Sequence, residues 1–121
     1  MVLHTAKVIE RRQHPRVELA VPAFAKTNSK LITGTTKDIS AGGAFICCQR
    51  PLQSGEVFEL LISASLGSPP IRAIAEVVRS HDSCPNSESE PHGMAVQFII
   101  ISDADSRFIS SIVSNHAANI L

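Results

Sequence analysis

The chain has 121 residues, of which 44% are hydrophobic and 18% charged, the length and composition of one folded domain. No apolar run approaches the roughly 20 residues of a membrane-spanning helix, and the first ten residues lack the sustained apolar segment of a secretory signal. The formal net charge is zero, which disfavours a protein that binds nucleic-acid polymers through their phosphates. We therefore expect a cytoplasmic domain that does not insert into membranes.

The N-terminal region is basic and has no clear periodicity. Residues 1–8 predict a flexible leader, and the folded domain is expected to span residues 9–121. Pro15 disfavours helix at His14 and favours an extended chain. Residues 1–37 carry seven basic and two acidic side chains. This excess of positive charge favours contact with a compact anion, although such a run is also typical of a solvated face.

Six segments with strand character follow. Each one alternates between apolar and polar residues, or is a short apolar run bounded by turn residues. Pro22 in the first segment indicates an edge strand or a bulge, and Gly34 in the second indicates a bulge. The predicted strands lie within 17–25, 31–40, 44–48, 57–63, 71–81 and 93–101.

The two segments that end the chain differ in character. Residues 82–92 are rich in Ser, Pro and acidic residues and predict a flexible hairpin loop between the last two strands. After the last strand a helix is predicted over about 103–119, with Ser102 as its N-cap and two aspartates in its first turn. Its apolar stripe should pack against the strands or partly against another subunit, and consists of Phe108, Ile109, Ile112, Val113, Ala117 and Ile120. The fold class is therefore mainly β, a six-stranded antiparallel β-barrel with a C-terminal α-helix.

The sequence does not indicate an enzyme, a metal site or a cofactor. Cys47, Cys48 and Cys84 lack metal-ligand spacing, and we interpret them as reduced; the adjacent pair should point to opposite faces of a strand. The histidines are scattered singly, which disfavours a metal centre. Ser40 has no nucleophile elbow around it. Without Trp or Tyr, the chain also lacks platforms for stacking nucleic-acid bases.

One stretch, TTKDISAGGAFI, stands out between the second and third predicted strands. If the extended conformation persists, Asp38 and Ser40 point to one face. Gly42 and Gly43 then permit a positive φ or the close approach of a ligand. By itself the stretch is a common turn.

Three arginines in the basic N-terminal region provide a second candidate motif. Arg12 and Arg16 form RxxxR, with Arg11 directly before it. A guanidinium group suits phosphate oxygens and the O6/N7 edge of guanine, whereas the carboxylate of Asp38 can accept hydrogen bonds from guanine N–H groups. Together the two motifs favour a ligand that is anionic and carries guanine. For either motif alone, the favoured interpretation would be the simpler one, in which the arginines are a solvated basic arm and Asp38 is a turn cap.

The order and spacing of these motifs resemble the signature of PilZ domains, which are bacterial receptors for cyclic di-GMP. RxxxR at Arg12 and Arg16 is followed by DxSxxG at Asp38, Ser40 and Gly43. The segment GMAVQFIII from residue 93 is similar to the closing strand of that family, and the resemblance spans about residues 9–115.

The resemblance implies a PilZ-like split barrel whose arginine arm wraps over cyclic di-GMP while the DxSxxG motif holds a guanine. The implied ligand-binding residues are Arg11, Arg12, Arg16, Asp38, Ser40 and Gly43, with Gly42 and Arg79 as neighbours. Arg11 would help to hold a stacked ligand dimer.

The function expected from this resemblance is that of a second-messenger receptor and adaptor. Binding would order the arginine arm over cyclic di-GMP and pass the signal to an unidentified effector protein, because 121 residues leave no room for an output domain. We expect a monomer or weak dimer. The alternative is a PilZ-like protein-interaction adaptor that does not bind nucleotide; a broken arginine motif or a lost Asp38 would favour it, and both are intact.

Overall fold

The computed structural model of the protein describes residues 15–84 and 87–120, the last four of these by their backbone only. Seven strands precede one helix in the described chain. The elements are β1 (Arg16–Glu18), β2 (Pro22–Lys26), β3 (Leu31–Ser40), β4 (Gly43–Cys48), β5 (Val57–Ile62), β6 (Ile71–Ser83), β7 (His92–Ile101) and α2 (Asp103–Ile120).

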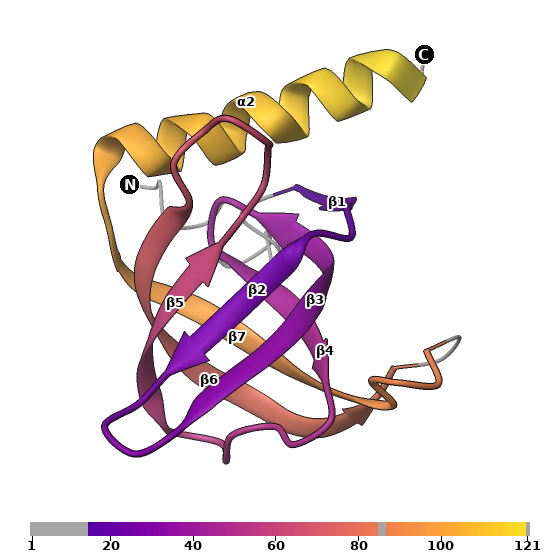
Figure 1. Ribbon diagram of the computed structural model, residues 1–121. Helices are drawn as coiled ribbons and strands as arrows, with labels where there is room; N and C mark the ends of the chain where they lie inside the picture. The colour runs from indigo at the N-terminus through magenta and orange to yellow at the C-terminus, as the bar shows by residue number, and fades with distance from the viewer. Residues whose placement is uncertain (1–14, 85–86, 121) are drawn as a thin grey trace, which may run out of the picture.

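Six of the strands close into an antiparallel barrel. Their order is β3-β2-β5-β6-β7-β4, and β4 pairs back with β3 to complete the ring. The seventh strand, β1, pairs with the last residues of β3. Figure 1 shows α2 lying across one end of this barrel, near β1. The predicted barrel with a C-terminal helix is therefore confirmed.

The first predicted strand is wrong in one respect, because it is two strands separated by residues 19–21. Thr36 explains the break. Its buried hydroxyl accepts a hydrogen bond from the backbone N–H of Val21 at 3.0 Å and donates to the carbonyl of Leu19. One side chain thus satisfies backbone groups that a strand ladder would otherwise pair. Pro22 is the first residue of β2, a position where strands tolerate proline.

The bulge predicted at Gly34 lies instead at Lys37. Thr36 pairs with Ile46 and Asp38 pairs with Phe45, which leaves Lys37 as the extra residue on β3. Gly34 serves close packing, because a Cβ there would lie 2.3 Å from the carbonyl oxygen of Cys47.

The barrel core is built from alternate residues of the strands, as the period-2 pattern predicts. Strand β4 is an exception, since all its residues are buried. Ala44 and Ile46 face the barrel interior. Phe45 and Cys47 face outward and form a second cluster, the outer cluster, with Cys84 and the half-buried Ala95.

The helix begins as predicted and packs against the strands. The hydroxyl of Ser102 accepts a hydrogen bond from the N–H of Asp105 at 3.1 Å, which is an N-cap. Ile109 and Val113 are buried in the main core, and α2 contacts β1 and β3. The side chains of Ala117 and Ile120 lie outside the described part. Within the described chain, no helix combines the length and the apolar character needed to span a membrane.

The interpretation of the cysteines as reduced is wrong for Cys47 and Cys84, which form a disulfide with 5.9 Å between their Cα atoms. The hairpin of β6 and β7 brings them together, and sequence spacing does not reveal such a long-range pairing. Cys48 is free and points into the barrel, so the adjacent cysteines do face opposite sides. Burial, and secondarily the nearby charge of Glu90, raises the pKa of Cys48 to about 11.

The predicted flexible loop over 82–92 is ordered at its ends. Strand β6 continues to Ser83, and β7 already begins at His92. The N–H of Cys84 donates to the carbonyl of Pro91 at 3.0 Å. The side chain of Gln49 donates to the carbonyl of Ser89, also at 3.0 Å. These contacts, together with the disulfide, fasten this hairpin end to β4 and the residues that follow it.

Candidate ligand-binding face

Strand β1 places one arginine of the first motif beside the second motif. Arg16 lies opposite Ser40, and Glu18 lies opposite Asp38. The pair between them, Val17 and Ile39, is buried in the core and fixes this pairing. Because alternate residues of a strand face opposite sides, Arg16 and Glu18 point outward, next to the DxSxxG residues.

Arg11 and Arg12 lie outside the described residues, as does the predicted leader 1–8. Of the predicted cationic anchors, Arg16 is therefore the one whose position relative to the second motif is defined. The side chain of Arg16 is exposed. It belongs to a three-residue strand that, among the described strands, pairs with β3 alone.

The turn between β3 and β4 is held by the serine of the motif. The hydroxyl oxygen of Ser40 accepts hydrogen bonds from the N–H groups of Gly42 at 3.1 Å and Gly43 at 3.2 Å. The Ser40 side chain is buried. The carbonyl of Gly42 in turn accepts a hydrogen bond from the N–H of Phe98 at 2.9 Å, which ties the turn to β7. Ser40 thereby fixes the conformation of the turn that follows Asp38.

Gly43 is needed for a reason that the sequence does not show. Its φ is not in the left-handed region, so of the two possibilities that a glycine offers here, the positive φ is not the one used. A Cβ at Gly43 would lie 2.1 Å from the carbonyl oxygen of Val96 on β7. The close approach is thus to a neighbouring strand.

Asp38 belongs to a row of outward-facing residues that crosses five strands, namely β1, β3, β4, β7 and β6. Its partners are Glu18 on β1 and Phe45 on β4. Phe45 in turn lies opposite Ala95 on β7, which lies opposite Arg79 on β6. Residues directly opposite one another in neighbouring strands share a face. We call this line of residues the outer row.

Three residues of this face were missed by sequence reasoning, namely Glu18, Lys37 and Phe45. Lys37 occupies the bulge beside Asp38, and its ammonium group lies 5.6 Å from the centre of the Phe45 ring, within reach of a cation–π contact. The alternation of β4 predicts that Phe45 and Ile46 face opposite sides. The bulge that brings Lys37 over the ring carries no signal in the sequence.

The predicted neighbour Arg79 is more remote from Asp38. It lies three strand spacings along the outer row, or about 14 Å. Its guanidinium is engaged with the carboxylate of Asp82 at 2.7 Å. The structure therefore brings together Arg16, Asp38, Ser40 and Gly43, and leaves Arg79 at the end of the row.

The chemistry of this face combines anionic acceptors with cationic donors. Among the described residues, neither Asp38 nor Glu18 takes part in an ion pair. Two carboxylates on directly opposed residues repel each other, so N–H donors of a ligand would relieve the repulsion. Arg16 and Lys37 flank them and can hold an anionic group.

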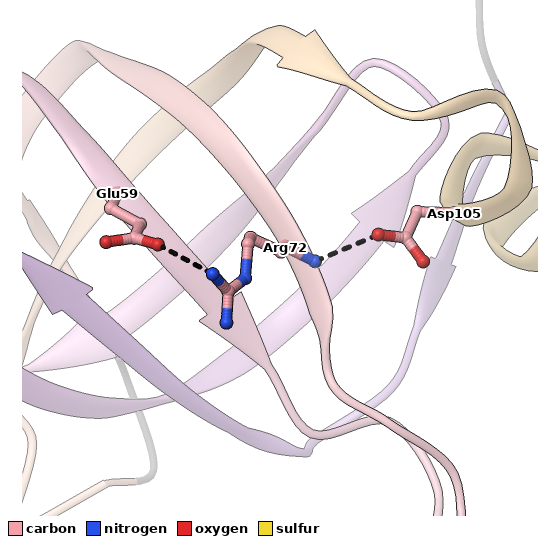
Figure 2. Close-up of polar contacts among 3 residues, drawn as sticks. All are labelled: Glu59, Arg72 and Asp105. Carbon is pink, nitrogen blue, oxygen red and sulfur yellow. Dashed lines mark hydrogen bonds and ion pairs between the residues drawn. The ribbon is translucent and has the colours of Figure 1, made fainter.

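Arg72, which lies elsewhere on the barrel, differs from Arg16 because, among the described residues, its side chain is engaged in an ion pair. In Figure 2, the side chain of Arg72 points to the carboxylate of Glu59 at 3.4 Å, while its backbone N–H donates to Asp105 of α2 at 3.2 Å. These contacts belong to β5, β6 and the start of the helix, and they involve none of the motif residues.

The sequence of the chain matches the PilZ domain family over residues 10–114. The chain belongs to the PilZ domain family. A search among curated proteins gives no significant match.

Solved structures include several similar to this PilZ domain. The inhibitor of motility MotI/DgrA from Bacillus subtilis has a TM-score of 0.77 and 25% identity, over 90% of this chain and 52% of that chain. The PilZ domain of YcgR from Escherichia coli, solved with c-di-GMP, has a TM-score of 0.72 and 15% identity, over 91% and 94% of the two chains. The c-di-GMP-dependent transcription regulatory factor MrkH has a TM-score of 0.72 and 21% identity, over 89% and 52%. This PilZ domain thus spans about half the length of MotI/DgrA and of MrkH.

Proposed function

We propose that this PilZ domain is a receptor for cyclic di-GMP that transmits its bound state to a partner protein. The observation that carries the proposal is the pairing of β1 with β3, which sets Arg16 opposite Ser40 and two residues from the partner of Asp38. Two motifs more than twenty residues apart in sequence thereby share one outer face of the barrel. Family membership and the neighbouring PilZ domain solved with c-di-GMP support the same ligand.

Each residue of the face has a role in this proposal that follows from its chemistry. Arg16 binds a phosphate through its guanidinium fork, and Arg11 and Arg12 add further cationic anchors from the preceding segment. The carboxylate of Asp38 accepts hydrogen bonds from a guanine, and Ser40 and Gly43 hold the turn that displays it. Gly42 belongs to the same turn, whereas Arg79, at the far end of the outer row and paired with Asp82, has no direct ligand contact in this proposal.

The output in this proposal is a shift in the conformation of the arginine arm. Binding favours the arm folded over the nucleotide, and a partner that contacts this arrangement detects the ligand. The chain works as a binding domain in the cytoplasm, without catalysis or a cofactor, and as a monomer or weak dimer.

Titration calorimetry with cyclic di-GMP tests the proposal. We expect saturable binding by the full chain, and a loss of affinity of roughly 10- to 100-fold in Arg16→Ala, which removes charge-assisted hydrogen bonds to phosphate. Asp38→Asn should also weaken binding without lowering thermal stability, because it relieves the repulsion from Glu18. Arg72→Ala is the matched control, since it removes an exposed arginine that contacts Glu59 rather than the motif face, and it should bind like the wild type.

The absence of heat at high micromolar ligand, or unchanged affinity in Arg16→Ala, would contradict the receptor proposal. It would favour the alternative of an adaptor that binds a protein without nucleotide.

A further inference from the structure

The disulfide lies on the same outer face as the proposed ligand site. Cys47 is two residues from Phe45 on β4, and both side chains belong to the outer cluster. Cys47 lies opposite Gly93 on β7, and Gly93 lies opposite Asp82 near the end of β6. The bridge from Cys47 to Cys84 therefore joins β4 to the residue that follows β6.

Gly93 also makes room for Phe45. A Cβ at Gly93 would lie 2.3 Å from the edge of the Phe45 ring. The ring thus occupies the space over the backbone of β7, with the disulfide beside it and Lys37 within 5.6 Å of its centre. Since Phe45 is the cross-strand partner of Asp38, the disulfide is one packing contact away from the proposed guanine-binding carboxylate.

The disulfide also forms a wall of a surface cavity of about 500 Å³. Its lining includes Cys47, Cys84, Ser87 and Glu90. Glu18 and Lys37, the neighbours of Asp38 on β1 and β3, line the same cavity. The cavity gives a small thiol a route to the bridge, although Cys47 is only 5% and Cys84 6% exposed.

We propose that the Cys47–Cys84 disulfide is a redox-sensitive latch that holds the outer cluster, and with it the cyclic di-GMP site, in its binding-competent arrangement. This inference rests on the proposed function of that site. In a reducing cytoplasm, protein disulfides are typically transient and regulatory rather than permanent staples. A latch beside a ligand site couples ligand affinity to the redox state of the compartment.

Opening the latch is a thiol–disulfide exchange with a small dithiol reductant that enters the cavity. A thiolate of the reductant attacks one sulfur of the bridge, forms a mixed disulfide and releases the other cysteine, which takes up a proton. The second thiol of the reductant then displaces the remaining cysteine, so the reductant leaves as a disulfide and two protein thiols remain. Cys48 does not compete, because its thiol is buried and points into the barrel.

Two effects of opening act in opposite directions on ligand affinity. Release of Cys84 removes a packing partner of Phe45, so that the ring and Lys37 must be ordered again when the ligand binds, which weakens binding. Release also lets the carboxylate of Glu90 move away from an anionic ligand, which strengthens binding. If the Glu90 carboxylate and the ligand are about one Debye length apart, roughly 8 Å at physiological ionic strength, their screened repulsion changes the ligand affinity by less than about twofold. The ordering effect therefore decides the direction.

The experiment compares the oxidised and the dithiothreitol-reduced full chain in titrations with cyclic di-GMP, after mass spectrometry has verified each state. We expect reduction of the folded protein to weaken binding by about three- to tenfold. Cys84→Ser should bind like the reduced wild type in both buffers. Glu90→Gln should remain within twofold of the wild type and keep the response to reduction.

Several outcomes would overturn the latch. These are equal affinity in the two states, tighter binding after reduction, loss of the response in Glu90→Gln, or a disulfide that opens only when the protein unfolds. Absence of binding in both states would instead count against the proposed function. The latch is then judged from amide NMR spectra of the ligand-free chain. Shifts of Lys37 and Phe45 on reduction support it, whereas shifts confined to Cys84 and residues 87–91 overturn it.

Discussion

At the scale of single residues, two glycines occupy positions where a neighbouring strand or side chain leaves no room for a Cβ. Gly43 faces the carbonyl oxygen of Val96, a backbone atom, and Gly93 faces the ring of Phe45, a side chain. The distinction matters because a ring can be replaced by a smaller group, whereas a backbone carbonyl cannot. The two sites therefore differ in how they respond to the same substitution.

We expect Gly43→Ala to lower the free energy of unfolding by about 2–3 kcal/mol, because the added Cβ overlaps the backbone of β7. Urea denaturation measures this loss. Gly93→Ala should cost a similar amount alone, but Phe45→Leu in the same chain should recover part of it. No shortening of Val96 should rescue Gly43→Ala. A fully stable Gly43→Ala would show that the close approach to β7 is not required.

At the scale of elements, helix α2 is joined to the barrel at both its cap and its apolar stripe. Ser102 caps the first turn, and the Asp105 carboxylate of that turn accepts a hydrogen bond from the backbone N–H of Arg72 (Figure 2). Ile109 and Val113 then bury their side chains in the core. The cap thus sets where the helix starts relative to β6, and the stripe seats it over β1 and β3.

Ser102→Ala should destabilise the protein by about 1 kcal/mol, because the N–H of Asp105 loses its acceptor. Thermal unfolding followed by circular dichroism measures the effect. Ser110→Ala is the matched control, since Ser110 is exposed within the helix and alanine has the higher helix propensity. Equal melting temperatures for the two variants would argue against the cap.

How far the sequence predicts these elements depends on whether the signal is local. Alternation located the strands, and the shift to helical spacing after Ser102 located α2, because both patterns are read within a dozen residues. The break between β1 and β2 was missed, because the hydroxyl of Thr36 that satisfies the connector lies on another strand. The bulge at Lys37 and the disulfide were missed for the same reason, since each depends on which strands become neighbours.

The candidate site shows the same difference between local signals, which the sequence carries, and strand neighbours, which it does not. The spacing of RxxxR and DxSxxG indicated which residues to consider, and the pairing of β1 with β3 brings Arg16, Asp38 and Ser40 together. Phe45 was assigned only to a strand, although it lies opposite Asp38. The positions of Arg11 and Arg12 fall outside the described chain, so their roles stay predictions.

At the scale of the whole molecule, one covalent bond links residues 37 positions apart in the chain. Such a crosslink restricts the unfolded chain, and for a loop of this length the expected stabilisation is about 2–4 kcal/mol. That is a substantial share of the roughly 5–15 kcal/mol by which most domains are stable.

Reduction of the disulfide should therefore lower the free energy of unfolding by about 2–4 kcal/mol, measured by urea denaturation with and without a dithiol. Cys84→Ser should show the lower stability in both conditions and no response to the reductant. If the wild type has the same denaturation midpoint in both conditions, the crosslink contributes nothing to global stability.

The three residues of strand β1 have two different roles. The single inward side chain, Val17, supplies the anchor, while Arg16 and Glu18 on either side of it face outward and take no part in the main core. Docking of the strand and recognition of a ligand thus depend on different residues of the same three-residue strand. Substitutions at these two outward-facing positions can therefore change or abolish ligand binding in the course of evolution while the barrel core stays the same.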